Sequence, residues 1–204
     1  MFPLYTIIDT DVCAARGFDP SVLCDAFLAG GARLIQLRDK RPGTRARLEL
    51  ADQLVSQCGP RGAQLIVNDY ADIARLSGAA GVHVGQDDLH VEDARAFLGP
   101  EAIIGVSTHD AAQIDAAATT SASYIAVGPI YATTTKETGY SARGLELVRR
   151  AATTGKPVVA IGGITLERAA EVLAAGAASV AVISDLLTGD PEARVRTFLR
   201  RLSA

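Results

Sequence analysis

Short apolar runs alternate with segments of helical periodicity along the whole chain. Each run is nearly continuous in its hydrophobicity, as expected for a strand that is buried on both faces. Each is followed by a segment whose apolar residues recur every three or four positions, as in an amphipathic helix. The predicted strands cover residues 4–8, 34–37, 65–67, 81–84, 103–106, 124–127, 157–161 and 180–183.

Predicted helices separate these strands. The first opens at Pro20 and is closed by Gly30 and Gly31. Buried strands separated by helices form a parallel sheet, and eight such units fit a closed (β/α)8 TIM barrel better than an open sheet. No Gly-x-Gly-x-x-Gly sequence follows the first strand, which argues against a dinucleotide-binding open sheet. Because the sequence contains no linker-like segment, we predict a single compact α/β domain over residues 1–204. The later helices are predicted near residues 44–57, 73–76, 91–98, 110–118, 145–152, 166–175 and 191–202.

Composition and charge narrow the possible functions. The net charge is −3 and tryptophan is absent, so neither a nucleic-acid surface nor a polybasic membrane patch is indicated. The first residues lack the basic and apolar regions of a signal peptide, and no apolar stretch is long enough to span a bilayer. Cys13, Cys24 and Cys58 are odd in number and form no CxxC motif, which favours reduced thiols in a cytoplasmic protein.

Polar and glycine-rich clusters follow the predicted strands, whereas the loops before the strands look like plain connectors. In a barrel of this kind the ligand site is built from the loops after the strands. Glycine at positions 162 and 163 allows close backbone approach to a phosphate after the seventh strand, and Ile183 and Ser184 follow the eighth. The alternative is that these glycines only turn the chain. After the sixth strand, the sequence GPIYATTTK (Gly128–Lys136) gathers hydroxyl groups and an ammonium, which suit an anionic ligand better than a core element.

Acidic and basic side chains gather at neighbouring strand ends. Asp69 and Asp88 are unpaired in the sequence pattern and suit a Mg²⁺ ion held by carboxylates and ligand phosphate. For Asp87 a helix-capping role is favoured. Three cations suit a diphosphate bound to that ion, with salt bridging to Asp39 or Glu137 as the alternative. These cations are Arg38, Lys40 and Lys136, whereas Arg41 and Glu137 are expected to be surface charges.

The histidines offer no clear catalytic base. His83 lies within a strand and is expected to be a layer residue of the barrel, and His90 is assigned to the surface. His109 lies near the strand ends, where a proton carrier and a helix-start residue are both plausible. No Ser-His-Asp order or nucleophile elbow is evident, so covalent catalysis is not predicted.

Taken with these clusters, the chain resembles the thiamine phosphate synthase (thiamine-phosphate diphosphorylase) family over nearly its whole length. The resemblance implies a transferase that joins a hydroxymethylpyrimidine diphosphate to a thiazole phosphate, or to its carboxylated form, by a dissociative, Mg²⁺-assisted substitution. Several motifs in the same order make the resemblance specific. They are QLRDK (Gln36–Lys40), VND (Val67–Asp69), GVHVGQDD (Gly81–Asp88), GVSTH (Gly105–His109), GPIYATTTK (Gly128–Lys136) and AIGGI (Ala160–Ile164).

The resemblance also implies roles for individual residues. Asp69 and Asp88 match the family's Mg²⁺ ligands. The expected partners are the small-molecule substrates, with no nucleic acid and no membrane, and a homo-oligomer stays possible. Barrels of this kind often self-associate, but the sequence identifies no interface. Four residues match the family's catalytic contacts: Arg38, Lys40, Ser107 and Lys136. The contacts to the pyrimidine diphosphate are matched by these four together with Gln36 and Asn68. The contacts to the thiazole phosphate are matched by Thr133, Thr134, Thr135, Gly163, Ile183 and Ser184.

Two segments depart from the family pattern. No basic residue follows the first strand directly. Ala132 stands where the family usually has proline, and residues 137–142 after it are also unusual.

Three other functions remain as alternatives: a thiazole tautomerase on the same barrel, a sugar-phosphate isomerase or epimerase, and a non-catalytic regulator that binds thiazole phosphate. The pairing of Asp69 with Asp88 argues against the tautomerase, the lack of a clear acid–base pair argues against the isomerase, and the presence of Asp88 and Lys136 argues against the regulator.

Overall fold

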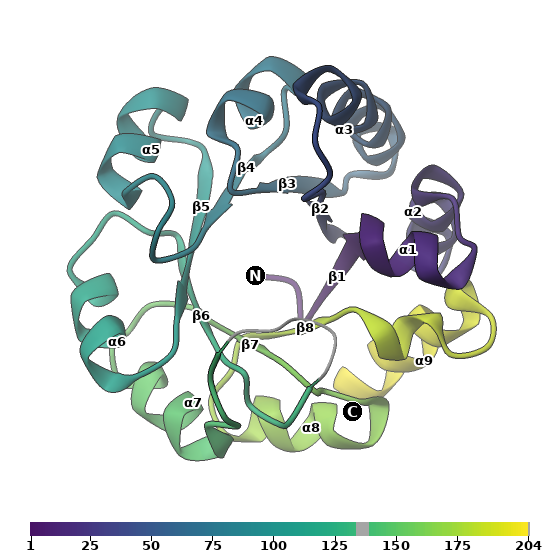
Figure 1. Ribbon diagram of the computed structural model, residues 1–204. Coiled ribbons are helices and arrows are strands. Elements are labelled where there is room, and N and C mark those ends of the chain that lie inside the picture. The colour runs from purple at the N-terminus through teal and green to yellow at the C-terminus, as the bar shows by residue number, and fades with distance from the viewer. Residues whose placement is uncertain (134–138, 204) are drawn as a thin grey trace.

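The apolar runs pair with one another in the order of the sequence and close on themselves (Figure 1). In this computed structural model, which describes residues 1–133 and 139–203, each strand is parallel to its neighbours and the last pairs with the first. The predicted TIM barrel is therefore confirmed. Its strands are β1 (Leu4–Asp9), β2 (Leu34–Arg38), β3 (Gln64–Asn68), β4 (Gly81–Val84), β5 (Ile103–Thr108), β6 (Tyr124–Val127), β7 (Val158–Ile161) and β8 (Ser179–Val182).

Helices surround the barrel, and at least one lies between each two consecutive strands (Figure 1). None of those in the described residues is long and apolar enough to cross a membrane. The α-helices are α1 (Thr10–Arg16), α2 (Pro20–Ala29), α3 (Thr44–Cys58), α4 (Ala71–Ser77), α5 (Val91–Leu98), α6 (Ala111–Ala118), α7 (Gly144–Ala152), α8 (Leu166–Ala174) and α9 (Pro191–Leu202), and the short 3₁₀ helices are η1 (Gly59–Arg61) and η2 (Ser184–Leu187).

Strand side chains are divided between two apolar clusters. One cluster lies between the sheet and the helices and includes Ile8, Phe27 and Leu54, all fully buried. The other fills the barrel interior. Because each strand serves both clusters, its sequence is apolar at nearly every position, and each buried Leu, Ile, Val or Phe contributes about 1.5–3 kcal/mol relative to an exposed one. The interior cluster consists of Tyr5, Ile7, Leu34, Ile66, Tyr124, Ala126, Val159 and Ala181.

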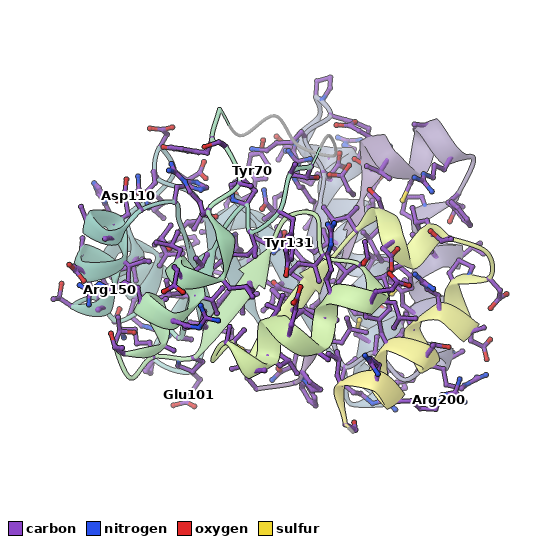
Figure 2. The ribbon with its side chains drawn as sticks, turned by 90° about the horizontal axis from the view of Figure 1, so that it is seen from below. Tyr70, Glu101, Asp110, Tyr131, Arg150 and Arg200 are labelled. Carbon is purple, nitrogen blue, oxygen red and sulfur yellow. The ribbon has the colours of Figure 1, made fainter. Side chains whose placement is uncertain are left out.

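The two ends of the barrel differ in their loops, as Figure 2 shows from the side. Tyr70 and Asp110, which follow β3 and β5, lie toward the end at which the strands terminate. Glu101, which precedes β5, lies at the opposite end, where the connecting turns are short. Since all strands are parallel, every loop after a strand reaches the same end of the barrel.

Helix α1 is the main element that the hydrophobic pattern did not predict. It starts directly after β1, and the Oδ1 atom of Asp9 accepts hydrogen bonds from the backbone N–H groups of Asp11 and Val12 at 3.1 Å each. Gly17, in the left-handed conformation, ends it. A helix of only 7 residues is too short to show a periodic pattern, and its stability comes from its cap and its packing.

Candidate active site

A pocket of about 940 Å³ opens at the end of the barrel where the strands terminate. Thr134, Thr135 and Lys136 lie outside the described residues, so the structure does not test their predicted roles. All other residues that the sequence placed in the site line this one pocket, so loops from seven strands converge on it. They are Gln36, Arg38, Lys40, Asn68, Asp69, Asp88, Ser107, Thr133, Gly163, Ile183 and Ser184.

Asp69 and Asp88 lie together at one side of the pocket. Asp69 has a backbone φ of 65°, a conformation that Asp and Asn adopt more readily than most residues, and its carboxylate forms an ion pair with Lys40. Burial raises the pKa of Asp69, the ion pair with Lys40 opposes that effect, and the neighbouring Asp88 raises the pKa further. The Oδ2 atom of Asp88 accepts from the backbone N–H of Gly85 at 2.7 Å. The sequence pattern suggested that Asp69 is unpaired. In the structure it forms an ion pair with Lys40.

Helix capping does not explain these acids. Helix α4 begins after Tyr70 and helix α5 after His90, and neither helix has a side-chain cap. The capping role predicted for Asp87 is therefore wrong; its side chain lines the pocket instead. His90 is exposed, as expected.

Arg38 reaches the pocket with one partner that the sequence did not indicate. Its Nη1 atom donates to Oδ2 of Asp9 at 2.5 Å, across the β1–β2 pair. For Arg38 the alternative of a salt bridge to Asp39 is wrong, because Arg38 pairs with Asp9 and Asp39 is bound by Thr10 and Arg41. The Nε atom of Arg38 is buried and donates to no group among the described residues, so this guanidinium has a spare donor in the wall of the pocket.

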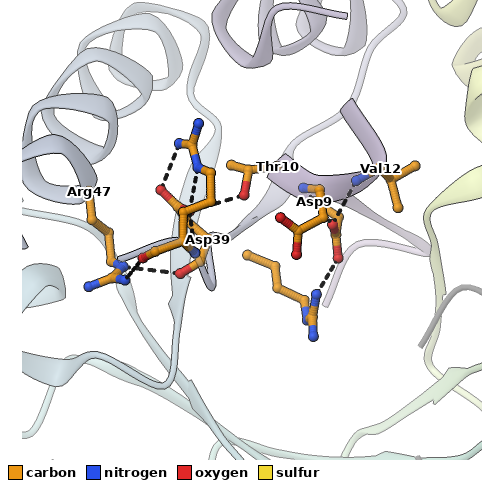
Figure 3. Close-up of polar contacts among 8 residues, drawn as sticks. Asp9, Thr10, Val12, Asp39 and Arg47 are labelled. Carbon is orange, nitrogen blue, oxygen red and sulfur yellow. Dashed lines mark hydrogen bonds and ion pairs between the residues drawn. The ribbon is translucent and has the colours of Figure 1, made fainter. Parts of the chain in front are cut away.

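Asp39 is the centre of a polar cluster behind the pocket (Figure 3). It is 4% exposed and accepts hydrogen bonds from Thr10 Oγ1 at 3.0 Å and from Nε and Nη2 of Arg41 at 2.8 Å each. Arg41 is exposed, as expected of a surface charge, but it also pairs with the buried Asp39. Burial alone would raise the pKa of Asp39, but the hydrogen bonds from Arg41 and Thr10 outweigh it and hold the pKa below the usual 3.8.

This cluster predicts how acid affects stability. A carboxylate with a lowered pKa stabilises the fold above the pKa of the unfolded chain, and that contribution is lost as the pH falls through the lower, folded-state value. We expect Asp39→Asn to reduce the free energy of unfolding by about 1–3 kcal/mol at neutral pH, the range for a hydrogen-bonded charged group. The deficit relative to wild type should shrink when the pH falls below 3.8. Urea unfolding at several pH values measures both effects.

The matched control is Asp25→Asn, since the ion pair of Asp25 with Arg61 is about half exposed on both sides. That variant should lose less than about 1 kcal/mol, as exposed pairs do. An Asp39→Asn deficit that stays the same in acid would show that the charge of Asp39 does not matter.

A chain of hydrogen bonds crosses the barrel floor and joins two predicted substrate contacts. Gln36 Nε2 donates to the Tyr5 hydroxyl at 3.0 Å, and the hydroxyls of Tyr5 and Tyr124 are 3.1 Å apart. His83 Nδ1 lies 2.9 Å from the Tyr124 hydroxyl, and its Nε2 lies 2.8 Å from Ser107 Oγ. His83 is thus a layer residue, as expected, but it also connects Tyr124 to Ser107.

Counting hydrogens gives this chain a direction. Burial raises the pKa of both Tyr5 and Tyr124 far above neutrality, so each phenol keeps its proton. The Tyr5 hydroxyl already accepts from Gln36, and its own hydrogen is satisfied only if it donates to Tyr124. Tyr124 then donates to His83 Nδ1, and the Nε2–H of His83 donates to Ser107. This order leaves the Ser107 hydroxyl hydrogen available to a pocket ligand.

Gly162 and Gly163 have a packing reason of their own. Both have positive φ, 100° and 63°, which favours glycine. A Cβ atom at Gly163 would lie 2.5 Å from the carbonyl oxygen of Ala132, and one at Gly162 would lie 2.6 Å from Pro129 Cα. The two glycines therefore do turn the chain, which was the alternative that the sequence left open. Their lack of a side chain also leaves room for the segment that follows β6. A phosphate contact at Gly163 stays a prediction.

His109 lines the same mouth. Its Nδ1 atom lies 2.6 Å from the carbonyl oxygen of Gly128, so Nδ1 carries a hydrogen and donates. Its ring stacks on Tyr140, with centroids 4.3 Å apart. Asp110 and not His109 caps helix α6, by accepting from Gln113 N at 2.9 Å.

Two pocket arginines were missed by the sequence analysis. Arg16 ends helix α1 and brings to the pocket a positive charge that no residue directly after β1 supplies. The Asp9 cap and Gly17 were the signals that could have placed it. Arg168, on α8, donates to the carbonyl oxygen of Gly163 at 3.1 Å and lies over the Tyr131 ring, where no short-range motif marked it.

The fold and the pocket together define a TIM-barrel protein whose pocket is lined by residues at the carboxyl ends of the strands and in the loops that follow them. Residues 4–186 match the family model TMP-TENI, thiamine monophosphate synthase. The chain belongs to this family, and it is accordingly an enzyme of the transferase class, of the thiamine-phosphate diphosphorylase type.

Individual relatives agree with this assignment. The chain is 43% identical to the thiamine-phosphate synthase of Koribacter versatilis, over 98% of this chain and 95% of that protein. It is 50% identical to the thiamine-phosphate synthase of Mycolicibacterium paratuberculosis over 85% and 82% of the two chains. It also matches the bifunctional protein ThiM/ThiE of Symbiobacterium thermophilum at 45% identity, but spans only 41% of that longer protein. Among solved structures, thiamine phosphate pyrophosphorylase from Pyrococcus furiosus superposes with a TM-score of 0.89 at 30% identity, over 99% of this chain and 96% of that one.

Proposed function

We propose that this protein condenses a hydroxymethylpyrimidine diphosphate with a thiazole phosphate to give thiamine phosphate and diphosphate. The bond between the pyrimidine methylene carbon and the diphosphate oxygen breaks first, and its electron pair leaves with the diphosphate. The lone pair of the thiazole nitrogen then forms the new bond to that carbon. Family membership supports the overall reaction, and the order of the two steps is our proposal.

One observation carries the proposal: the pocket holds its paired acidic and basic groups on one side and neutral hydrogen-bonding groups on another. Lys40, Asp69 and Asp88 form its charged side. Gln36 and Ser107, joined through the barrel floor, form a neutral polar side. A pyrimidine that carries a diphosphate needs both environments at once, because its ring is neutral and its leaving group is strongly anionic.

The chain's own residues act mainly on the leaving group. Negative charge grows on the diphosphate as the carbon–oxygen bond breaks, and fixed cations stabilise it most at that stage. Lys40 lies in the pocket beside Asp69, and Arg38 is oriented by Asp9 with its Nε atom unpartnered among the described groups. Gln36 and the Ser107 hydroxyl orient the ring, since buried hydrogen-bonding groups discriminate strongly against ligands that leave them unpaired.

The acidic pair fits a magnesium ion. Asp88 lies close enough to Asp69 to disfavour ionisation of the Asp69 carboxylate, and a divalent cation between them would relieve that repulsion. A pair of carboxylates suits Mg²⁺, because this ion is usually held by one or two carboxylates with phosphate and water. When bound, the ion would neutralise charge on the leaving diphosphate.

A coupled assay tests the proposal. With both substrates and Mg²⁺, we expect thiamine phosphate and diphosphate to form in equal amounts, and a chelator of divalent cations should abolish the reaction. Product formation that persists in the chelator would contradict the metal assignment but not the reaction. Proton exchange on the thiazole phosphate without condensation would instead indicate a tautomerase. Binding of thiazole phosphate with neither reaction would indicate a regulator.

A further inference from the structure

We infer that Arg47 is a positioning residue that sets the relative placement of Lys40 and Asp69 in the pocket. It lies on α3 behind the pocket wall and does not line the cavity. The inference rests on the proposed function, since it concerns how the charged side of that site is held in shape.

Arg47 holds the backbone on both sides of Lys40. Its side chain is buried, with 6% of the residue exposed, and Nε donates to the carbonyl oxygen of Asp39 at 3.0 Å (Figure 3). Its Nη2 atom donates to the carbonyl oxygen of Arg41 at 2.5 Å. A planar guanidinium fixes two acceptors at a set spacing, which a lysine ammonium on a flexible stem does not. Lys40 is the residue between these two carbonyls, so its Cα position follows from the Arg47 fork.

The same guanidinium contacts the loop that carries Asp69. Its Cζ atom lies 3.8 Å from the centre of the Tyr70 ring, a cation–π contact between the buried Arg47 and the half-buried Tyr70. Tyr70 directly follows Asp69, and its backbone N–H donates to the carbonyl oxygen of Asn68 at 2.9 Å. Asp69 itself has the positive φ of 65°. Arg47 thus touches both loops whose side chains meet in the Lys40–Asp69 ion pair.

The loop around Lys40 needs such a support. Residues 39–43 form no regular structure between β2 and α3, and the side chain of Lys40 is 43% exposed at the pocket edge. Asp39 anchors the loop through its side chain, to Thr10 and Arg41. Among the described residues, Arg47 is the side chain that donates hydrogen bonds to the backbone carbonyls of this loop, those of Asp39 and Arg41. A shift of about 1 Å in a catalytic group can reduce turnover by about 100-fold, so this support is expected to be visible in kinetics.

The test compares Arg47→Met with Arg47→Lys and with Arg95→Met. Arg95 is the matched control because it also donates to backbone carbonyls, those of Gly99, Pro100, Ala102 and Ser121, but next to the turns at the opposite end of the barrel. We expect both methionine variants to lower the thermal midpoint. Only Arg47→Met should also weaken binding of inorganic diphosphate in Mg²⁺ buffer, measured calorimetrically, by about tenfold, with kcat/KM falling by about 10- to 100-fold. Arg47→Lys should restore part of both.

A double variant separates positioning from general destabilisation. If Arg47 acts through Lys40, Arg47→Met should have little further effect on diphosphate binding once Lys40 is already methionine, because the two effects are not independent. Equal diphosphate affinity of Arg47→Met and wild type, or a full additional loss in the Lys40→Met background, would overturn the inference. A wild-type protein that forms no thiamine phosphate would instead overturn the proposed function.

Discussion

Replacing Asp69 with asparagine is expected to reduce kcat/KM by about 100- to 1,000-fold, the usual cost of removing one preorganised electrostatic group. The variant removes the charge that holds Lys40 and that, with Asp88, is proposed to bind Mg²⁺. It should also raise the Mg²⁺ concentration needed for half-maximal activity. Steady-state kinetics with Mg²⁺ varied at saturating substrates measures both effects.

The fold should survive this change. Asparagine tolerates the positive φ of residue 69. The raised pKa of Asp69 means that its ionised form is disfavoured in the folded state, so stability from this group is present at low pH and lost as the pH rises. The thermal midpoint of Asp69→Asn at neutral pH should therefore not fall. Asp72→Asn, at an exposed position on α4, is the control and should stay fully active. Wild-type activity of Asp69→Asn would contradict the assignment of Asp69 and Asp88 as Mg²⁺ ligands.

Replacing Tyr124 with phenylalanine is expected to have the second-largest effect. The change removes one hydroxyl from the middle of the chain that joins Gln36 to Ser107 and leaves His83 Nδ1 without that donor. The histidine can then accept from Ser107, and the Ser107 hydrogen no longer points to the ligand. An unmade buried hydrogen bond costs about 1–3 kcal/mol. With 1.4 kcal/mol per tenfold change, kcat should fall by about 10- to 100-fold.

Tyr5→Phe is the matched control for this experiment. It removes the acceptor of Gln36 but keeps Tyr124, His83 and Ser107 connected, so it should raise KM for the pyrimidine substrate more than it lowers kcat. The ring of Tyr124 packs over Gly105, where a Cβ atom would lie only 2.0 Å from Tyr124 Cζ, and phenylalanine keeps that packing. In a Ser107→Ala background Tyr124→Phe should add little. A full additional loss there would refute the relay to Ser107.

The strands and their ends are marked by local signals in the sequence. A buried strand such as 124–127 is apolar at every position, and a glycine or acidic residue at its end marks where it leaves the core. This pattern also placed Asp69 and Asp88 at one end of the barrel, because parallel strands all terminate there. It missed α1 because 7 residues with a cap carry too little periodicity.

The sequence by itself determined the eight-unit barrel and the end at which its chemistry gathers, since burial and chain direction are properties of short segments. Only the tertiary structure decided which charges and hydroxyls meet. Arg38 pairs with Asp9 and not with its neighbour Asp39, and Tyr5 meets Tyr124 from 119 residues away. Such partners depend on the direction of each side chain across a closed sheet, and the hydrophobic pattern of the chain contains no record of that direction.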